Sequence, residues 1–168
     1  MNRTIAKLSD LMVFNYGKSL TTKSRTQGKV PVYSSAGHTG WHNTPNIEVP
    51  CIIVGRKGTV GTVYYCNFPI FCIDTAYYVT QADTSLPLLV AFRLLKSLNL
   101  PEYNEDAAVP GLNRNTVYGI EVEYPDVISI NKCNERLIPI HCSLDSNNIE
   151  ITRLQELSET LVSRLAVR

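Results

Sequence analysis

A heptad repeat of apolar residues over the last quarter of the chain constrains the fold more than any other feature. Apolar residues recur seven positions apart in one row and again in a second row, which is offset by three positions. The first row is Ile130, Leu137, Leu144, Ile151, Ser158 and Leu165, and the second is Cys133, Ile140, Asn147, Leu154 and Leu161. Two such rows form the seam of a coiled coil, so the sequence predicts one long helix over residues 126–168.

This helix is too long to be buried against a domain formed by residues 1–125, because residues 130–165 alone span about 50 Å. We expect it to project and to contact another helix. The predicted contact residues are Leu137, Leu144, Ile151, Leu154, Leu161 and Leu165. The alternative is a terminal helix that folds back on its own domain. Pro139 predicts a kink or a split in the helix, whereas Asn147 in the seam can fix the register of pairing.

The preceding residues 1–125 predict a mostly β domain with one packed helix. The expected strands or short turns are Leu8–Phe14, Val30–Ser34, Cys51–Val54, Thr62–Tyr65 and Ile73–Thr80. Thr84 or Ser85 can then cap a helix that has Pro87 in its first turn. Apolar residues recur there at helical spacing, namely Leu88, Leu89, Phe92, Leu95 and Leu98. A strand with alternating apolar residues follows at 120–124. The predicted fold class is therefore α+β.

The charge distribution suggests which half of the chain faces an anion. Residues 1–80 contain eight Lys or Arg and three Asp or Glu, whereas residues 81–168 contain eight and twelve. We therefore expect the first half of the chain to face an anion and the second half to be a solvated part that faces protein. No apolar run approaches the roughly 20 residues that cross a bilayer, and the N-terminus lacks the apolar core of a secretory signal. A cytoplasmic location without membrane contact is expected.

Cysteine and histidine spacing predicts no metal site. The five cysteines are an odd number and include no CxxC pair, so they are expected to be reduced and mostly buried. His38 and His42 are four positions apart, but Gly40 and Pro45 argue against a helix that directs both at one metal ion. No cofactor is predicted either.

The glycine-rich segment IIVGRKGTVGTVYY, from Ile52 to Tyr65, raises the question of nucleotide binding. Its glycines give GxxGxxG, which matches neither GxGxxG nor GxxxxGK[ST], and the following TVYY is typical of a strand. We therefore expect a connection between two strands with Arg56 and Lys57 at an exposed tip. A tight turn with solvated charges is the simpler alternative. Because GxSxG, HExxH and NPPY are also missing, the sequence predicts no active site.

Six motifs in order along the chain resemble one family. They are NYGKSL (Asn15 to Leu20), VPVYSSAGHTG (Val30 to Gly40), CIIVGRKGTVGTVYY (Cys51 to Tyr65), IDTAYYV (Ile73 to Val79), AVPGLNRNTV (Ala108 to Val117) and LDSNNIEITRLQEL (Leu144 to Leu157). Together they resemble a target recognition domain and its spacer helix from the DNA-specificity (S) subunit of type I restriction-modification systems.

The resemblance implies a non-catalytic subunit that recognises double-stranded DNA. In that family, a separate modification subunit methylates adenine using S-adenosylmethionine, and a translocase subunit drives cleavage. Family members usually carry two recognition domains and two long helices, whereas this sequence has one of each. Two copies paired through antiparallel helices could restore that arrangement and read a split palindrome. An exchangeable cassette with a different partner is the alternative.

We expect residues 1–125 to bind duplex DNA through basic side chains in glycine-flanked segments. The candidates are Lys18, Lys23, Arg25, Lys29, His38, Arg56, Lys57 and Arg114. Asp74 is expected to be a buried structural carboxylate, and each strand with paired tyrosines to place one ring in the core and one outside. Two alternatives remain, namely a coiled-coil adaptor whose β domain binds protein and a nucleotide-dependent enzyme built around Gly55 to Gly61.

Overall fold

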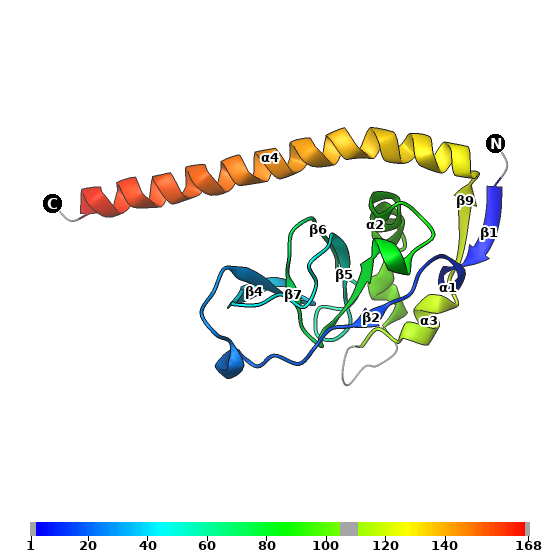
Figure 1. Ribbon diagram of the computed structural model, residues 1–168, viewed down its shortest axis with the longest axis horizontal. Helices are drawn as coiled ribbons and strands as arrows, with labels where there is room; N and C mark the ends of the chain where they lie inside the picture. Colours follow the sequence, from blue (N-terminus) through cyan, green and yellow to red (C-terminus); the bar gives the residue numbers. More distant parts are fainter. Residues whose placement is uncertain (1–2, 105–110, 167–168) are drawn as a thin grey trace.

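A β-rich domain lies beneath one long helix in the computed structural model, which describes residues 3–104 and 111–166 (Figure 1). The elements are β1 (Arg3–Lys7), α1 (Leu8–Leu11), β2 (Asn15–Tyr16), η1 (Thr22–Ser24), β3 (Val30–Ser34), β4 (Gly37–His42), β5 (Cys51–Gly55), β6 (Val63–Cys66), β7 (Phe71–Cys72), β8 (Ala76–Thr80), η2 (Gln81–Asp83), α2 (Leu88–Ser97), η3 (Leu100–Tyr103), α3 (Arg114–Tyr118), β9 (Glu121–Pro125) and α4 (Val127–Ala166). The predicted α+β class, with a long helix after a mostly β domain, is confirmed.

The central sheet has the strand order β2-β8-β5-β6 and is covered on both faces. Every residue of β5 is buried. Because successive side chains of a strand point to opposite faces, Ile52 and Val54 enter the larger core with α2, and Cys51 and Ile53 enter the smaller core with β7. An apolar run without alternation is what a strand buried on both faces requires.

The tyrosine pairs on β6 and β8 follow the same two-sided arrangement. Tyr64 packs against the smaller core and Tyr65 against the larger one, while Tyr77 is buried and Tyr78 is half-buried. The prediction that one ring of each pair points outside is therefore wrong, because the two rings of each pair pack against cores on opposite faces of the sheet.

Helix α2 packs on the central sheet, as predicted, and buries Leu88, Phe92 and Leu95 of the predicted row. Ala91, which was not predicted, is also buried, whereas Leu89 is not part of the core. Its cap differs from the prediction, since the Leu88 backbone N–H donates to Oε1 of Gln81 at 2.9 Å. The hydroxyls of Thr84 and Ser85 donate instead to the Leu11 carbonyl, at 3.0 and 3.4 Å. These two residues therefore connect α1 to the turn before α2.

Two of the segments predicted as strands or short turns differ from regular strands, and the first of them, Leu8–Phe14, contains no strand. The segment Leu8–Phe14 begins with the helical turn α1, because Leu8 and Leu11 are three positions apart and both enter the core, and Asp10 accepts a hydrogen bond from the Lys7 N–H. The segment Ile73–Thr80 contains a turn at Asp74 before β8 begins at Ala76. The Asp74 side chain is exposed there, so the prediction that it is a buried carboxylate is wrong.

Two smaller sheets complete the domain. Strands β4, β3 and β7 form a three-stranded sheet, in which β4 is an edge. Strands β1 and β9 form an antiparallel pair in which Arg3 is opposite Pro125. This pair brings the beginning of the described chain next to the start of α4 (Figure 1).

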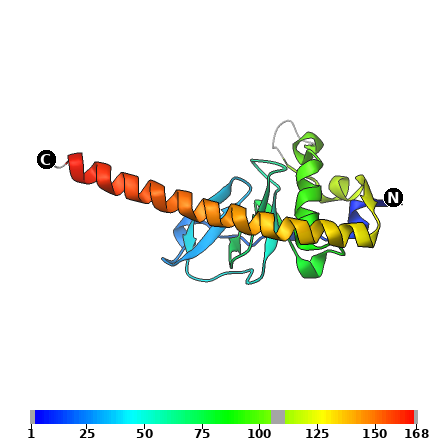
Figure 2. The same ribbon diagram turned by 90° about the horizontal axis from the view of Figure 1, so that it is seen from above.

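Helix α4 is continuous through Pro139 and curves gently over the domain (Figures 1 and 2). The predicted split is therefore wrong. Because Pro139 is exposed, its ring disturbs no packed side chain, and one missing hydrogen bond is tolerated within a 40-residue helix. At 1.5 Å per residue the helix is about 60 Å long. It is not apolar enough to cross a membrane, and the same holds for the other helices of the described segments.

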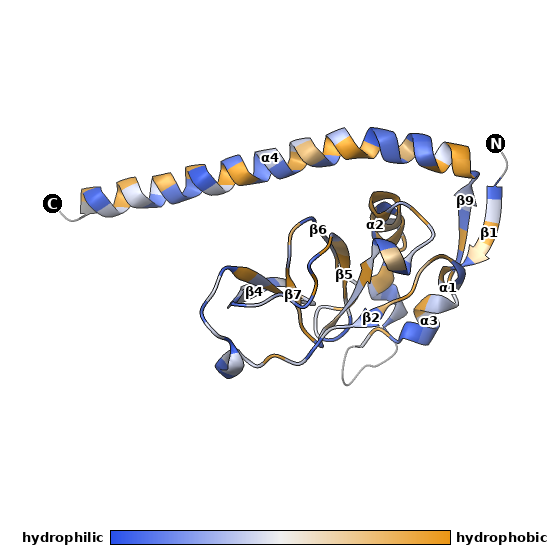
Figure 3. Ribbon diagram, viewed as in Figure 1, coloured by the Kyte–Doolittle hydropathy of each residue, from blue (hydrophilic) through white to orange (hydrophobic). Residues whose placement is uncertain are grey.

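The first half of α4 is docked on the domain. Ile130 is buried, and the His141 ring lies 4.5 Å from the Tyr65 ring and 6.1 Å from that of Phe92. From residue 146 to 165 every residue of α4 is exposed, and apolar bands alternate with polar ones along the helix (Figure 3). The fold thus combines both sequence-based alternatives, because one half of the helix folds back and the other half projects.

Candidate functional site

The glycine-rich segment forms a hairpin loop between β5 and β6. These strands are antiparallel, with Val54 opposite Val63, so the predicted connection between two strands is confirmed. Gly58 and Gly61 have φ angles of +79° and +75°, a region that favours glycine. At Gly61 a Cβ atom would also lie 2.4 Å from the Pro101 nitrogen. The loop therefore has a defined shape, and no helix N-terminus follows it.

The hairpin loop meets the segment before α3, which lies more than 50 residues later in the sequence. The Leu112 N–H donates to the Arg56 carbonyl at 2.7 Å, and Lys57 forms an antiparallel bridge with Gly111. The Tyr77 hydroxyl donates to the Leu112 carbonyl at 3.0 Å. The first three residues of the motif AVPGLNRNTV lie outside the described residues, and the next two, Gly111 and Leu112, contact the hairpin.

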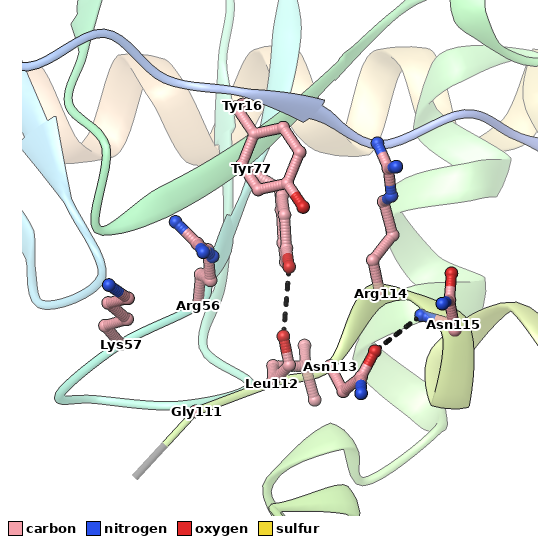
Figure 4. A pocket seen from close by; sticks show the side chains of 9 residues that line it. All are labelled: Tyr16, Arg56, Lys57, Tyr77, Gly111, Leu112, Asn113, Arg114 and Asn115. Atoms are coloured by element: carbon pink, nitrogen blue, oxygen red, sulfur yellow. Dashed lines mark hydrogen bonds between the residues drawn. The ribbon is translucent and has the colours of Figure 1, made fainter. Parts of the chain in front are cut away.

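Two arginines from these segments flank one tyrosine of β2 (Figure 4). The Cζ atoms of Arg56 and Arg114 lie 4.7 and 5.0 Å from the centre of the Tyr16 ring, distances typical of cation–π contacts. Each guanidinium also donates to a backbone carbonyl, Arg56 to Asp74 at 3.2 Å and Arg114 to Phe14 at 3.3 Å. Both arginines are thus held in place by the fold.

These residues line a hollow of about 320 Å³, together with Lys57, Tyr77, Asn113 and Asn115. Among residues 3–104 and 111–166, no carboxylate lies within 4.0 Å of Arg56, Lys57 or Arg114. The ion pair found in these segments joins Arg3 to Glu123 instead. Burial raises the pKa of the Tyr77 hydroxyl, an effect that the nearby Arg56 charge opposes. The hollow therefore carries three cationic side chains and suits an anionic group such as a phosphate.

The structure brings together three of the eight predicted DNA-contacting residues, which are Arg56, Lys57 and Arg114. The other five lie elsewhere on the domain. Lys18, Lys23 and Lys29 are exposed on the chain from β2 to β3. Arg25 donates through Nη1 to the Thr39 carbonyl, and the exposed His38 lies beside Trp41 with the ring centres 4.8 Å apart.

Tyr16, Tyr77, Asn113 and Asn115 line this hollow but were not predicted from the sequence. Tyr16 lies within the motif NYGKSL, and the asparagines lie within AVPGLNRNTV. The motifs therefore include these residues, but their order in the sequence does not indicate that segments this far apart meet in the fold.

The predicted contact residues of α4 fall into two groups. Leu137 is half-buried in the docked half of the helix. Leu144, Ile151, Leu154, Leu161 and Leu165 are exposed, and the seam continues past Asn147 and Ser158 to the end of the helix. This projecting part presents an apolar seam without a partner helix among the described residues.

Cysteine and histidine side chains make no evident metal site. Across the described part of the chain, no three His, Cys, Asp or Glu side chains gather as metal ligands. Cys51, Cys66 and Cys72 are buried in the smaller core, whereas Cys133 and Cys142 are exposed on α4. Burial raises the pKa of the Cys72 thiol to about 12, so this thiol stays protonated at neutral pH.

A β-rich domain with a cationic hollow, joined to a half-docked helix with an open seam, defines a class of binding proteins rather than a single activity. No family model matches the chain, and no curated protein matches it by sequence. Solved structures do match the fold.

The S subunit of a type I restriction-modification system from M. genitalium is similar, with a TM-score of 0.78 and 23% identity over 95% of this chain and 44% of that one. A chain from a structural study of complex assembly and conformational transition of the type I R-M system is also similar. Its TM-score is 0.63, with 14% identity over 97% of this chain and 43% of that one. The HsdS subunit from Thermoanaerobacter tengcongensis has a TM-score of 0.59, with 13% identity over 86% of this chain and 38% of that one.

The chain therefore has the fold of type I specificity subunits, which confirms the resemblance at the level of fold. It spans less than half the length of each of these three solved chains.

Proposed function

We propose that this chain is a non-catalytic DNA-recognition unit of a type I restriction-modification system. Its β domain binds one double-stranded DNA sequence and thereby directs adenine methylation and restriction by partner subunits. The observation that carries the proposal is the convergence of Arg56, Lys57 and Arg114 from separate motifs into one hollow. The similarity of the fold to type I specificity subunits supports it.

Within this function, the three cations have different roles. Lys57 is exposed and serves a backbone phosphate as a mobile point charge. Arg56 and Arg114 are fixed against Tyr16, and each uses one donor on a backbone carbonyl. A guanidinium has five N–H donors, so the remaining donors are available to a phosphate oxygen or a guanine edge.

The open seam of α4 supplies the second half of the proposal. We expect it to pair with another long helix, either in a second copy of this chain or within a complex that contains the methyltransferase subunit. Two copies related by a two-fold axis would read two half-sites, with the length of α4 setting the unread gap between them.

The first test identifies the target and then measures affinity for it. Methylome sequencing of cells that express this chain with a type I modification subunit would report the modified sequence. Steeply salt-dependent binding to that sequence, well above the affinity for random duplex, is the expected result. Equal binding to every duplex would contradict sequence recognition and leave the adaptor alternative.

A matched pair of variants then tests the hollow itself. Lys57→Ala should weaken binding to all duplexes and reduce the salt slope by about 1, the effect of one lost phosphate contact. Lys96→Ala removes the same charge from an exposed position on α2 and serves as the control. If both variants lose the same affinity, binding depends on the net positive charge of the domain and not on the hollow.

A second test addresses the seam of α4. Replacing Leu144, Ile151 and Leu154 with glutamine should abolish self-association or the capture of the modification subunit, while the β domain remains folded. Ile149→Gln changes an equally exposed apolar residue outside the two rows and is the control. Unchanged mass in light scattering together with unchanged subunit capture would refute pairing through this seam.

A further inference from the structure

A second hollow, of about 680 Å³, lies at the β3–β4 hairpin. Strands β4 and β7 lie at one end of the domain and α3 at the other, so this hollow is separate from the one at Arg56 and Arg114 (Figure 1). Its wall includes Lys29, Pro31, Tyr33, His38, Trp41 and Phe68. Aromatic rings and one lysine thus face a space in the usual size range of ligand sites.

A backbone irregularity builds this aromatic wall. Between the pairs Tyr33–His38 and Pro31–Trp41, β3 advances two residues and β4 advances three. Gly40 has a φ angle of +125° at the extra position. In a regular strand, residues three apart would point to opposite faces, but this bulge turns His38 and Trp41 to the same face. Their ring centres are 4.8 Å apart.

One residue of the wall, Phe68, is next to a contact between the domain and α4. Asn67 precedes Phe68 and donates through Nδ2 to Oδ2 of Asp145 at 2.6 Å. Trp41 and Phe68 nevertheless remain 54% and 42% exposed. Two large rings that remain open to solvent therefore line the same hollow.

The segment of chain that carries Trp41 contains cations but no carboxylates. Residues 11–47 contain four cations, Lys18, Lys23, Arg25 and Lys29, and no Asp or Glu. Lys29 is part of the wall. Arg25 lies against β4, where its Nη1 donates to the Thr39 carbonyl and a Cβ atom at Gly40 would lie only 2.7 Å from it.

We propose that this hollow holds an unpaired nucleobase of a DNA strand, stacked on Trp41 and Phe68, with Lys29 and Arg25 facing the adjoining phosphates. Single-stranded nucleic acid is bound in this way by aromatic platforms within cationic grooves. An apolar peptide would also fit the rings, but a segment with four cations and no acid favours a polyanion. The choice of DNA rests on the proposed function, whereas the stacking does not depend on duplex recognition at Arg56 and Arg114.

The test uses the fluorescence of Trp41, which is the chain's single tryptophan. A short single-stranded oligothymidylate is titrated into the full chain, and a strand of equal length with abasic sugars provides the same charge without bases. We expect saturable quenching by the oligothymidylate and at least roughly tenfold weaker binding of the abasic strand. Equal quenching by both strands would overturn the proposal.

Variants separate stacking from charge attraction. Phe68→Ala should weaken oligothymidylate binding roughly tenfold, while Val13→Ala, which shortens an exposed side chain outside the hollow, should leave it unchanged. Lys29→Ala tests the phosphate contact without altering a ring and should lower the salt slope by about 1. The two variants change different parts of the hollow, so poor folding of one leaves the other informative. If both bind the oligothymidylate as tightly as the unchanged chain, the proposal is overturned.

Three further outcomes bear on this inference, and the last two separate it from the proposed function. Saturable quenching by a proline-rich acidic peptide, without quenching by the oligothymidylate, would mark the hollow as a protein-docking surface and overturn the inference. Sequence-specific duplex binding that leaves Trp41 silent towards unpaired bases would overturn it while the proposed function stands. Stacking without any duplex specificity would support it while the proposed function fails.

Discussion

The β domain and helix α4 are stabilised in different ways, although they belong to one chain. The domain buries its central strand on both faces, and its residues Ile52 and Ile53 are wholly inaccessible to solvent. The projecting half of α4 buries nothing, and Leu154 remains 55% exposed there. The domain therefore owes its fold to contacts within the described chain, whereas the free half of α4 relies on helix propensity.

The largest expected difference comes from shortening one apolar side chain in each region. Ile52→Ala should lower the free energy of unfolding by about 2–5 kcal/mol, because it removes buried methyl groups and leaves a cavity. Leu154→Ala should change it by less than about 0.5 kcal/mol at a concentration where the chain is monomeric. Urea unfolding followed by tyrosine and tryptophan fluorescence measures both. Equal losses would mean that α4 already unfolds together with the domain.

A proline replacement acts on α4 alone. Pro139→Ala restores a hydrogen bond and should stabilise the helix locally by up to about 3 kcal/mol. Hydrogen exchange in the turns around residue 139 should then slow by up to about a hundredfold, while the urea midpoint of the domain stays constant. Ile138→Ala, at a neighbouring exposed position, is the control. A shifted midpoint for Pro139→Ala alone would show that the helix and the domain are energetically coupled.

The smallest effect is a pH-dependent one at the turn before α2. Burial would raise the pKa of Asp83, but hydrogen bonds from the Thr80 N–H and hydroxyl outweigh it and hold that pKa below the ordinary 3.8. A lowered folded-state pKa adds stability above about pH 4, and this stability is lost as the pH falls through the folded value. Asp83→Asn should therefore cost about 1 kcal/mol at neutral pH and nothing in strong acid.

Urea midpoints at several pH values measure that difference. Asp126→Asn provides the counterpart in α4, because Asp126 accepts a hydrogen bond from the Ser129 N–H in the first turn of the helix. We expect its effect in the hydrogen exchange of α4 and not in the midpoint of the domain. A pH-independent cost for Asp83→Asn would contradict the assigned role of the ionised carboxylate.

The sequence predicted elements that follow from local pattern. Helix α2 and the pair β5–β6 were expected because their apolar spacing and glycine positions have local causes. The turn α1 was missed because a buried pair three residues apart, Leu8 and Leu11, also suits a run of β-forming residues. Asp74 was misplaced because a two-residue turn interrupts its apolar segment. These errors arise where tertiary packing decides between two locally acceptable conformations.

The candidate site was predictable only in part, for a related reason. Basic residues beside glycines identified Arg56, Lys57 and Arg114 individually, but their convergence depends on the bridge between Lys57 and Gly111. The aromatic hollow was missed because His38 and Trp41 would lie on opposite faces of a regular strand. A bulge has no periodic signature in a single sequence, so this hollow is apparent only in the folded chain.

The pairing of β1 with β9 has a consequence for how the domain can be exchanged during evolution. Because Arg3 is opposite Pro125, the chain enters and leaves the β domain at neighbouring points. A segment bounded in this way can be exchanged by recombination for one of different sequence and length without displacing α4, since both junctions stay in place. The sequence of the domain and the sequence of the helix can therefore vary separately.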